Sequence, residues 1–354
     1  MPQTCKTKSF LYFSFMILVT GGTGLIGAHL LYFLVLENDT IRATCRPSSD
    51  LATVERVFAY YSTDYHTLFQ KIEWFEADIT DIHALDKAFE GVTEVYHSAA
   101  LISFDPSDYH LMRTINIEGT ANIVNFCIAN KIRKLCYVSS VAAIGKKGNN
   151  AVNTEETEWL IENNNYGYAI TKYGAEMEVW RASQEGIPVV IVNPGVVLGP
   201  GYWHQGSGQL FGKVNKGLRF YSEGITGYVG VIDVVKIMLR LMNETIENER
   251  FILVSEHKSY REVFNLIAQH LNKKPPSVKV TPFLAELIWR LEKVKYLITR
   301  KAPLLTKNSA KSLTRNKYYS SEKLHARLNY QYEPIEEVIA QTCAIYVKEM
   351  DKEN

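Results

Sequence analysis

The chain has 354 residues, of which 46% are hydrophobic and 22% are charged, and its 39 Lys and Arg nearly balance its 38 Asp and Glu. This balance gives no reason to expect a nucleic acid as a partner, because proteins that bind nucleic acids usually carry a strong basic excess. The chain is long enough to bury a large core and to form two lobes.

The five cysteines are an odd number and show neither paired nor metal-ligand spacing. Cys127 and Cys136 fall in apolar segments, where a buried thiol is the usual state. The nine histidines are scattered without a cluster of cysteines or carboxylates. We therefore expect a reducing, cytoplasmic environment and no metal site.

The N-terminus superficially resembles a signal peptide, because Lys6 and Lys8 precede the apolar run 10–19. The run continues without a small-residue cleavage site into a glycine motif, and it is too short to span a bilayer. We interpret residues 1–15 as an N-terminal extension, either an appended tail or an artefact of start-site choice.

Residues 20–27 read Thr-Gly-Gly-Thr-Gly-Leu-Ile-Gly and lie between an apolar strand at 16–20 and a helix from about residue 25. Gly21, Gly24 and Gly27 recur at every third position. One glycine allows the tight turn, one lets the backbone approach a pyrophosphate and one lets helix and strand pack closely. A glycine triplet alone could mark a flexible turn, but this context predicts a dinucleotide site. Its predicted contacts are Gly21, Thr23, Gly24, Leu25, Ile26 and Gly27.

Further strands are predicted at 41–45, 72–76, 93–97, 134–138 and 188–193, and helices at 82–90, 114–129 and 166–184. This alternation predicts an α/β fold, a Rossmann-type doubly wound parallel sheet. The apolar run 251–254 should add a strand to that sheet after a helix that begins near residue 232. The dinucleotide-binding domain would then span 16–200 with about 228–255 returning to it. A smaller, discontinuous substrate lobe would comprise 201–227 and 256–354.

Tyr168 and Lys172 lie one helical turn apart on the same face of the predicted helix 166–184. A positive charge at that distance favours phenolate, so the tyrosine could exchange a proton nearer neutral pH. The spacing arises easily by chance, and Tyr319 with Lys323 repeats it. Only Tyr168 lies downstream of a glycine motif and of a strand ending in hydroxyls, so we interpret Tyr319 as a surface or packing residue.

Seven motifs appear in a fixed order, at residues 20–27, 77–81, 95–100, 116–120, 139–140, 168 with 172, and 193–201. This ordered set resembles the extended short-chain dehydrogenase/reductase family, which includes nucleotide-sugar epimerases, dihydroflavonol reductases and 3β-hydroxysteroid dehydrogenases. The segments 42–46 and 318–330 look most like the dihydroflavonol reductase and hydroxysteroid dehydrogenase branches. Asn329 departs from the glycine that is usual there.

The resemblance implies four catalytic residues. Tyr168 would be the general acid or base, and Lys172 would lower its pKa and hold the nicotinamide ribose. Ser140 would hydrogen-bond the substrate oxygen, and Asn116 would support a proton relay. The alternative for Ser140 is a strand-end hydroxyl that satisfies local backbone, and for Asn116 a side chain that bonds a neighbouring turn.

The resemblance also implies cofactor contacts, at Arg46, Asp78, Ile79, Ala99, Ala100, Tyr168, Lys172, Pro194 and Val197. Enzymes that use NAD usually carry an acid at the end of the second strand, but residues 41–49 contain none. Arg46 would instead meet a 2′-phosphate, so we expect NADP to be preferred, with NAD as the alternative. Asp78 would bond the adenine amine, Ile79 would lie beside the ring, and Pro194 and Val197 would lie along the nicotinamide. Arg46 could instead be a solvated arginine, and Asp78 a turn-forming residue.

The expected function is an NAD(P)-dependent oxidoreductase that acts on a carbonyl or alcohol of a small, cyclic or apolar substrate. Dehydration is disfavoured, because Val141 and Ala142 follow Ser140 where sugar dehydratases carry Asp-Glu. The alternatives are a nucleotide-sugar epimerase with tightly bound NAD and a non-catalytic nucleotide sensor. Ser103, Tyr202 and Trp203 follow motifs that border the pocket and are candidate substrate contacts, or else ordinary loop residues. A homodimer is left open.

Charge is uneven along the chain, since residues 258–327 hold sixteen Lys and Arg against four Glu. The simplest explanation is solvated helix faces. The interleaving of apolar and basic residues at 283–301 leaves three other interpretations: a site for an anionic substrate tail, a cap on the substrate pocket, or a contact with a membrane surface, the last of which we do not favour.

Overall fold

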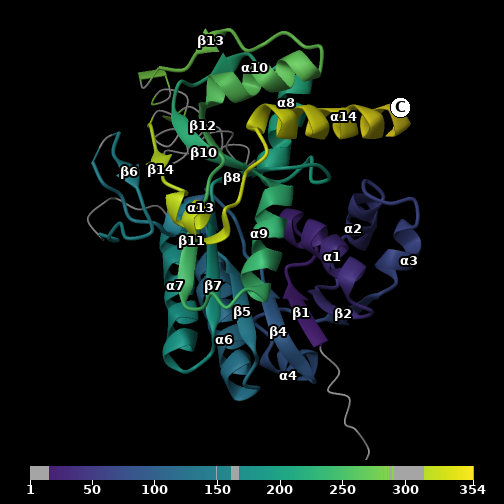
Figure 1. Ribbon diagram of the computed structural model, residues 1–354. Helices are drawn as coiled ribbons and strands as arrows, with labels where there is room; N and C mark the ends of the chain where they lie inside the picture. Colours follow the sequence, from purple (N-terminus) through teal and green to yellow (C-terminus); the bar gives the residue numbers. More distant parts are fainter. Residues whose placement is uncertain are drawn as a thin grey trace, which may run out of the picture.

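The computed structural model describes residues 16–148, 150–160, 167–281 and 315–353, together with positions 283, 284, 286, 289 and 290. A seven-stranded sheet forms the centre of the molecule, with strand order β11-β7-β5-β4-β1-β2-β3 (Figure 1). Every neighbouring pair in it is parallel. The strands are β1 (Met16–Thr20), β2 (Ile41–Cys45), β3 (Ile72–Glu76), β4 (Val92–His97), β5 (Lys134–Val138), β7 (Val189–Pro194) and β11 (Glu249–Leu253). The predicted doubly wound sheet is confirmed, including the return of the last strand.

Helices cover both faces of this sheet because side chains of a strand alternate between its faces. In β1, Ile17 and Val19 join one apolar cluster, whereas Leu18 joins the other. The first face is covered by α1 (Leu25–Glu37), α2 (Leu51–Phe58) and α9 (Val231–Asn243). The second is covered by α4 (Ile82–Ala88), α6 (Gly119–Ala129) and α7 (Gly167–Gln184). Burial on both faces explains why strands β5 and β7 are almost continuously apolar.

A third apolar cluster is formed by elements that lie beyond the carboxyl ends of these strands, in the upper part of Figure 1. It packs around a small sheet of order β12-β10-β8, with β8 (Val196–Leu198), β10 (Ile225–Gly230) and β12 (Glu256–Ser259). The surrounding helices are α8 (Gln209–Asn215), α10 (Tyr260–His270) and α14 (Ile335–Glu353). Helix α10 begins with a capping box between Ser259 and Glu262. The boundaries of the two lobes stay a prediction.

The sequence-based prediction located neither α2, α8, α10 and α14 nor the strands of the small sheet, and it also missed several shorter elements. They are α3 (Tyr65–Phe69), α5 (Tyr109–Arg113), α13 (Glu322–Leu328), β6 (Val152–Asn153), β9 (Phe220–Tyr221), β13 (Val278–Lys279), β14 (Tyr318–Tyr319) and 3-10 turns at Pro106–Asp108, Val141–Ala143 and Gly206–Gly208. The predicted helix 114–129 starts with a π-helical turn, Thr114–Glu118, before α6. Asn329 ends α13 in the left-handed region with φ 46°. Glycine and asparagine tolerate that conformation best, which explains why asparagine can replace the glycine of the resembling families.

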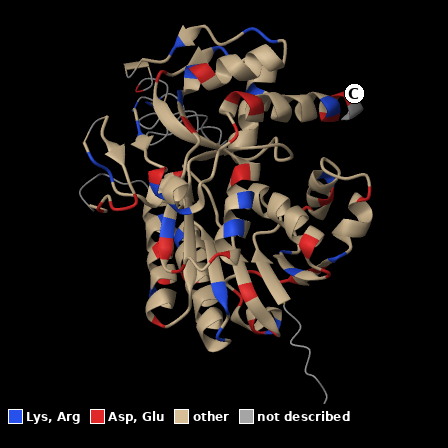
Figure 2. Cartoon of the chain, in the orientation of Figure 1, with Lys and Arg blue, Asp and Glu red and all other residues tan. Residues whose placement is uncertain are grey.

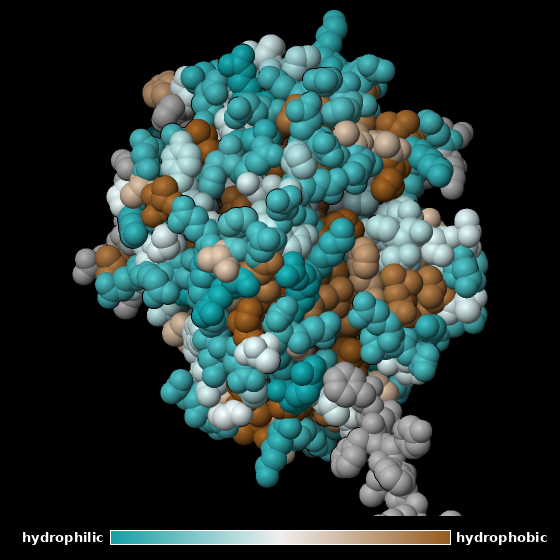
Figure 3. All heavy atoms as spheres, in the orientation of Figure 1, coloured by the Kyte–Doolittle hydropathy of each residue, from teal (hydrophilic) through white to brown (hydrophobic). Residues whose placement is uncertain are grey.

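Acidic and basic residues are interspersed over the chain, and the face shown is mostly hydrophilic with hydrophobic areas between (Figures 2 and 3). Cys127 and Cys136 are buried, as expected. In the part of the chain that the structure describes, no helix combines the length and apolar character needed to cross a membrane. Residues 1–15 and most of the basic, apolar stretch 283–301 lie outside the described residues.

Candidate active site

The glycine turn after β1 has a distinct task for each glycine. Gly21 adopts φ 73°, and a Cβ there would lie 2.4 Å from the Ala99 nitrogen. A Cβ on Gly27 would lie 2.1 Å from the Gly21 oxygen, so the first turn of α1 can approach β1 only with glycine. Gly24 precedes α1 and provides no side-chain cap, which leaves backbone N–H groups of the first turn for another acceptor. Thr23 lies in this turn, at the carboxyl end of β1.

The strands on either side of this turn are β4 and β2, so the turn lies where the strand order reverses. Such switch points are where open α/β sheets bind ligands. Ala99 and Ala100 follow β4 at the same edge. The next residue, Leu101, is held at both backbone groups by the amide of Asn116, at 2.7 Å to its nitrogen and 3.0 Å to its oxygen. The Asn116 amide also donates to Thr171 Oγ1 of α7 at 3.1 Å.

The buried Asn116 therefore links the loop after β4 to α7 through hydrogen bonds. This is the structural alternative named above for Asn116, a side chain that bonds a neighbouring turn. Asn116 lies within the π-helical turn Thr114–Glu118. Single π turns in helices often occur at functional sites because they re-aim one side chain. A part in proton relay stays a prediction.

The end of β2 carries an exposed arginine. Arg46 forms a turn with Ser49, in which the Arg46 nitrogen lies 2.9 Å from Ser49 Oγ. Asp50, the first acid after β2, is engaged elsewhere: it caps α2 by accepting from the Thr53 nitrogen at 3.1 Å and from Thr53 Oγ1 at 2.6 Å. The side chain of Arg46 thus remains exposed at the place where a ribose acid would stand.

Asp78 and Ile79 follow β3. Asp78 Oδ1 accepts from the nitrogen and the hydroxyl of Thr80, at 2.9 and 2.6 Å, which is the turn-forming alternative. Ile79 is buried, and a Cβ on Gly119 would lie 2.6 Å from its Cδ1. Their contacts with adenine stay predictions.

Ser140 and Tyr168 are brought together by β5 and α7. Ser140 Oγ accepts from the Ala142 nitrogen at 3.1 Å, and the Ser140 side chain also hydrogen-bonds Tyr168. Tyr168 is 9% exposed. Burial raises its pKa to about 12, although the bond to Ser140 lowers it in part. We expected the charge of Lys172 to lower the pKa of Tyr168, but in this structure the pKa is raised, because burial has the largest effect.

Lys172 is 2% exposed and lies over the carboxyl end of β5. Its ammonium donates to Tyr137 Oη at 2.9 Å and to the Val138 oxygen at 2.7 Å, and it lies 4.5 Å from the centroid of the Tyr137 ring. Burial lowers the pKa of Lys172 to about 7, and the charge of Glu176 raises it in part. The ammonium is thus fixed by hydrogen bonds and close to its titration point at neutral pH.

The remaining predicted contacts lie after β7. Pro194 ends β7, and Val197 lies in β8. Between them, a Cβ on Gly195 would lie 2.4 Å from the Gly227 oxygen, so β7 and β10 meet closely here. Because β7 and β5 are parallel neighbours, Pro194 at the end of β7 lies at the same carboxyl edge of the sheet as Ser140, which follows β5.

Two of the three candidate substrate residues, Ser103 and Trp203, have hydrogen-bond partners, whereas the buried hydroxyl of Tyr202 has none among the described residues. Ser103 Oγ donates to Asp108 Oδ2 at 2.6 Å. Trp203 Nε1 donates to Glu349 Oε2 at 2.6 Å, and both Tyr202 and Trp203 are buried in apolar clusters. These contacts explain the residues as parts of the framework, and a direct contact with substrate stays a prediction.

Three residues near the site were missed by the sequence analysis. The Phe104 ring is 46% exposed, and its centroid lies 6.3 Å from that of Tyr168. Tyr137 holds Lys172. Glu176 lies one turn after Lys172 on α7, and this spacing of four residues was the visible signal.

The second Tyr-Lys pair does not form such a site. Tyr319 is buried in β14 and packs with Ile144 and Val254. Lys323 belongs to a different element, α13, and lies 3.0 Å from Glu249 Oε2. Tyr319 is therefore a packing residue, as predicted.

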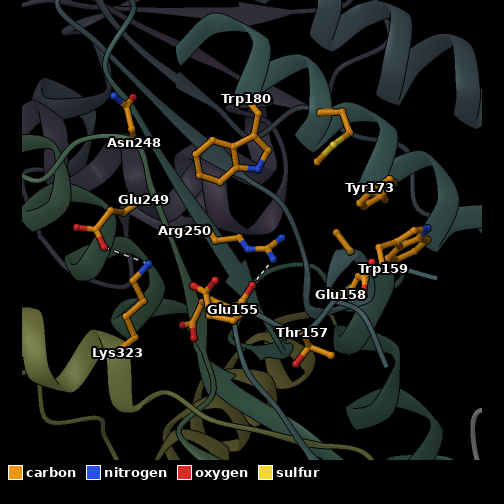
Figure 4. Close-up of a pocket in the computed structure, with 13 residues that line it drawn as sticks. Glu155, Thr157, Glu158, Trp159, Tyr173, Trp180, Asn248, Glu249, Arg250 and Lys323 are labelled. Atoms are coloured by element: carbon orange, nitrogen blue, oxygen red, sulfur yellow. Dashed lines mark hydrogen bonds and ion pairs between the residues drawn. The ribbon is translucent and has the colours of Figure 1, made fainter. Parts of the chain in front are cut away.

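A separate pocket of about 440 Å³ lies beside another face of α7. Trp159 and Tyr173 stack there with ring centroids 4.4 Å apart, and Arg250 extends along it toward Glu155 (Figure 4). Among the residues placed in the structure, no three His, Cys, Asp or Glu side chains gather in a way that could hold a metal ion.

Comparison with known proteins identifies the family of the chain. The chain belongs to the NAD-binding family described as male sterility protein, which matches residues 19–260. It is 26% identical over 276 residues to sterol demethylase protein B of Methylococcus capsulatus, covering 76% of this chain and 78% of that protein. It is 27% identical over 337 residues to a putative dihydroflavonol 4-reductase of Synechocystis, covering 91% and 92%.

A solved structure shows the same fold. The UDP-glucose 4-epimerase of Thermotoga maritima, solved with UDP-glucose, aligns over 95% of this chain and 99% of its own, with a TM-score of 0.74 and 20% identity. The membership of the extended short-chain dehydrogenase/reductase group that the motif order predicts is confirmed.

Proposed function

We propose that this chain is an NADP-preferring oxidoreductase that interconverts a carbonyl and an alcohol on a small, cyclic or apolar compound, and that it favours reduction at neutral pH. The observation that carries the proposal is the hydrogen bond between the partly exposed Ser140 and the buried Tyr168, beside Lys172 at the carboxyl edge of the sheet. A sensor that only binds nucleotides has no need of these three groups together.

The residues present fit a dinucleotide. The turn at Gly21 and Gly24 leaves backbone N–H groups at the start of α1 for phosphate oxygens. Arg46 is exposed at the end of β2, while Asp50 caps a helix, so this corner suits a 2′-phosphate better than a ribose hydroxyl. Lys172 would hold the nicotinamide ribose hydroxyls. When bound, NADPH supplies the hydride.

The chain itself supplies the proton and its control. With a pKa of about 12, Tyr168 carries its phenolic proton at neutral pH and can give it to the carbonyl oxygen. The Ser140 hydroxyl would hydrogen-bond the same oxygen and stabilise the negative charge that develops there. The reverse reaction needs the phenolate, which a raised pKa disfavours, so at neutral pH the resting site holds the protonation state that reduction requires.

The substrate class rests on Phe104, whose exposed ring beside Tyr168 offers an apolar surface to a planar or cyclic group. The names of two relatives, a sterol demethylase protein and a putative dihydroflavonol reductase, also point to ring compounds. We therefore favour cyclic ketones over sugar nucleotides.

The proposal is tested by incubating the purified chain with NADPH and a panel of cyclic ketones and apolar aldehydes while the absorbance of NADPH is followed. Consumption of NADPH by at least one compound, absent in Tyr168→Phe, is expected. No consumption with any compound, together with NAD that copurifies with the chain and epimerisation of a sugar nucleotide, would favour an epimerase instead.

A further inference from the structure

Glu176 is a carboxylate inside the protein, with 0% of its surface exposed. Its Oε2 accepts from Ser139 Oγ at 2.6 Å and from Asn193 Nδ2 at 2.8 Å. Its Oε1 accepts from Arg250 Nη1 at 2.8 Å. A buried charge is tolerated only with such partners, because its hydration is lost on burial.

The three donors come from neighbouring strands of the central sheet. Ser139 follows β5 and directly precedes Ser140, whereas Asn193 lies in β7 directly before Pro194. The Asn193 amide also donates to the Ser140 oxygen at 3.1 Å. Arg250 lies in β11, the next strand along the sheet. One carboxylate on α7 thus binds the three strands that end beneath the proposed site.

We propose that Glu176 is a positioning residue: it holds the ends of β5 and β7 in register with α7, and so fixes Ser140 relative to Tyr168. The proposal rests on the oxidoreductase function proposed above. A displacement of about 1 Å between reacting groups can lower a rate by about 100-fold, so such a tie has a direct effect on turnover.

Glu176 also has an electrostatic effect on the site. The titratable groups around Lys172 are Tyr137 on β5, His97 on β4, and Tyr168 and Glu176 on α7 itself. Burial, with a smaller effect of the lysine charge, lowers the pKa of His97 to about 3, so this ring is neutral. The carboxylate of Glu176 raises the pKa of Lys172 and so favours its ammonium.

A purely structural ion pair is the competing explanation. Arg250 bonds the Glu155 backbone oxygen as well as Glu176, and it reaches the surface in the pocket of Figure 4. A buried pair of this kind can be replaced by apolar residues without loss of stability, whereas removal of one partner leaves an uncompensated charge. Stability alone therefore cannot distinguish the two roles.

The test compares kcat/KM for carbonyl reduction in Glu176→Gln and in the matched control Glu178→Gln, which loses a partly exposed ion pair with Arg181 on the same helix. We expect a fall of about 100-fold for the first variant and no change for the second. The double variant Glu176→Gln/Arg250→Met removes the uncompensated charge, so it serves if the single variant does not fold. It should recover thermal stability but not activity. Recovery of both would overturn the proposal.

The pH profile gives a readout that a purely structural role does not affect. In Glu176→Gln, the alkaline fall of kcat/KM should move to lower pH by about one pH unit, because the ammonium of Lys172 loses its nearby anion. Glu176→Asp keeps the negative charge. Its kcat/KM should therefore decrease at nearly the same alkaline pH as in the unchanged protein, even where its kcat is reduced. An unmoved profile in folded Glu176→Gln would count against the proposal.

Binding of NADPH, measured by its fluorescence, separates this proposal from the proposed function. Glu176→Gln should displace Lys172 and Pro194 and so weaken NADPH binding by about tenfold, which is the scale of one hydrogen bond to a charged group. If the unchanged protein binds NADPH but reduces no carbonyl compound, the proposed function fails, and the loss of affinity still supports positioning. Equal NADPH affinity in the two proteins would overturn it.

Discussion

The ammonium of Lys172 lies 2.9 Å from the hydroxyl oxygen of Tyr137, so a strand residue that precedes Ser140 by three positions orients the lysine of the site. The same ammonium donates to the Val138 oxygen at 2.7 Å. Helix α7 and strand β5 are thus joined directly beneath Tyr168. The charge state of Lys172 is then the property of the site that responds most directly to pH.

The rate of reduction should fall as pH rises through neutrality. Burial lowers the pKa of Lys172 to about 7, so its ammonium is present below that pH and is lost above it. We expect kcat/KM with NADPH to decrease above about pH 7, with the lost ammonium weakening the grip on the cofactor ribose. In Lys172→Arg the charge persists, so the decrease should move to higher pH. A profile that stays flat in alkaline solution would contradict the assignment.

NADPH should bind more tightly than NADH. Arg46 is exposed at the end of β2, and its guanidinium can pair with a 2′-phosphate. Arg46→Ala should narrow the gap in binding free energy by roughly 1 to 3 kcal/mol, as expected for a hydrogen bond to a charged group. Titration of both cofactors into both proteins measures this gap. Equal affinities in the unchanged protein would show that Arg46 does not select the cofactor.

Tyr168→Phe should leave NADPH affinity nearly unchanged while turnover falls by about two to four orders of magnitude, because the positioned proton donor is lost. Tyr319→Phe is the matched control, since Tyr319 is also buried but packs in β14 away from Lys172. Its turnover should change little. The opposite ranking would mean that the wrong tyrosine was assigned.

Stability should fall as solutions are acidified from pH 6.5, because two histidines are buried in neutral form. Burial lowers the pKa of His29 to about 4, against a small opposing effect of the Pro200 carbonyl, and lowers that of His97 to about 3. Below pH 6.5 the unfolded chain binds protons that the folded chain does not, so each histidine should cost about 1.4 kcal/mol per pH unit. Urea unfolding between pH 6.5 and 4.5 measures this slope.

His29→Gln/His97→Gln should reduce that slope, whereas His66→Gln, at an exposed position of α3, should leave it unchanged. The fold lowers the pKa of some carboxylates, such as Glu256 and Glu262. Their contribution to stability is lost only at lower pH, near and below the ordinary pKa of a glutamate. A slope that the double variant retains would assign the acid sensitivity to other groups.

The sequence predicted the parts of the fold that depend on local pattern. The strand, glycine turn and helix around Gly21, Gly24 and Gly27 follow from residue type alone, and the structure gives Gly21 and Gly27 a steric reason. The period of apolar residues located the seven strands of the sheet. Short elements such as α3 and β14 were missed, since they depend on tertiary packing more than on periodicity.

The site was predicted less completely, because burial is a property of the folded chain. The spacing of Tyr168 and Lys172 suggested a lowered phenol pKa, but desolvation raises it. The hydrogen bonds of Asn116 to Leu101 and of Glu176 to Asn193 join different elements, so local sequence pattern does not indicate them. Asn116 is also oriented by a π-helical turn, which apolar periodicity does not indicate.

The most direct test of the account follows the hydride, with NADPH that carries deuterium at the transferable position of the nicotinamide ring. A carbonyl reductase should place one deuterium in each molecule of alcohol and form one NADP⁺ for each product molecule, with both lost in Tyr168→Phe. Product that forms without deuterium while the NADPH pool stays constant would contradict the account, because the hydride would then have returned to the substrate from a cofactor held in the protein.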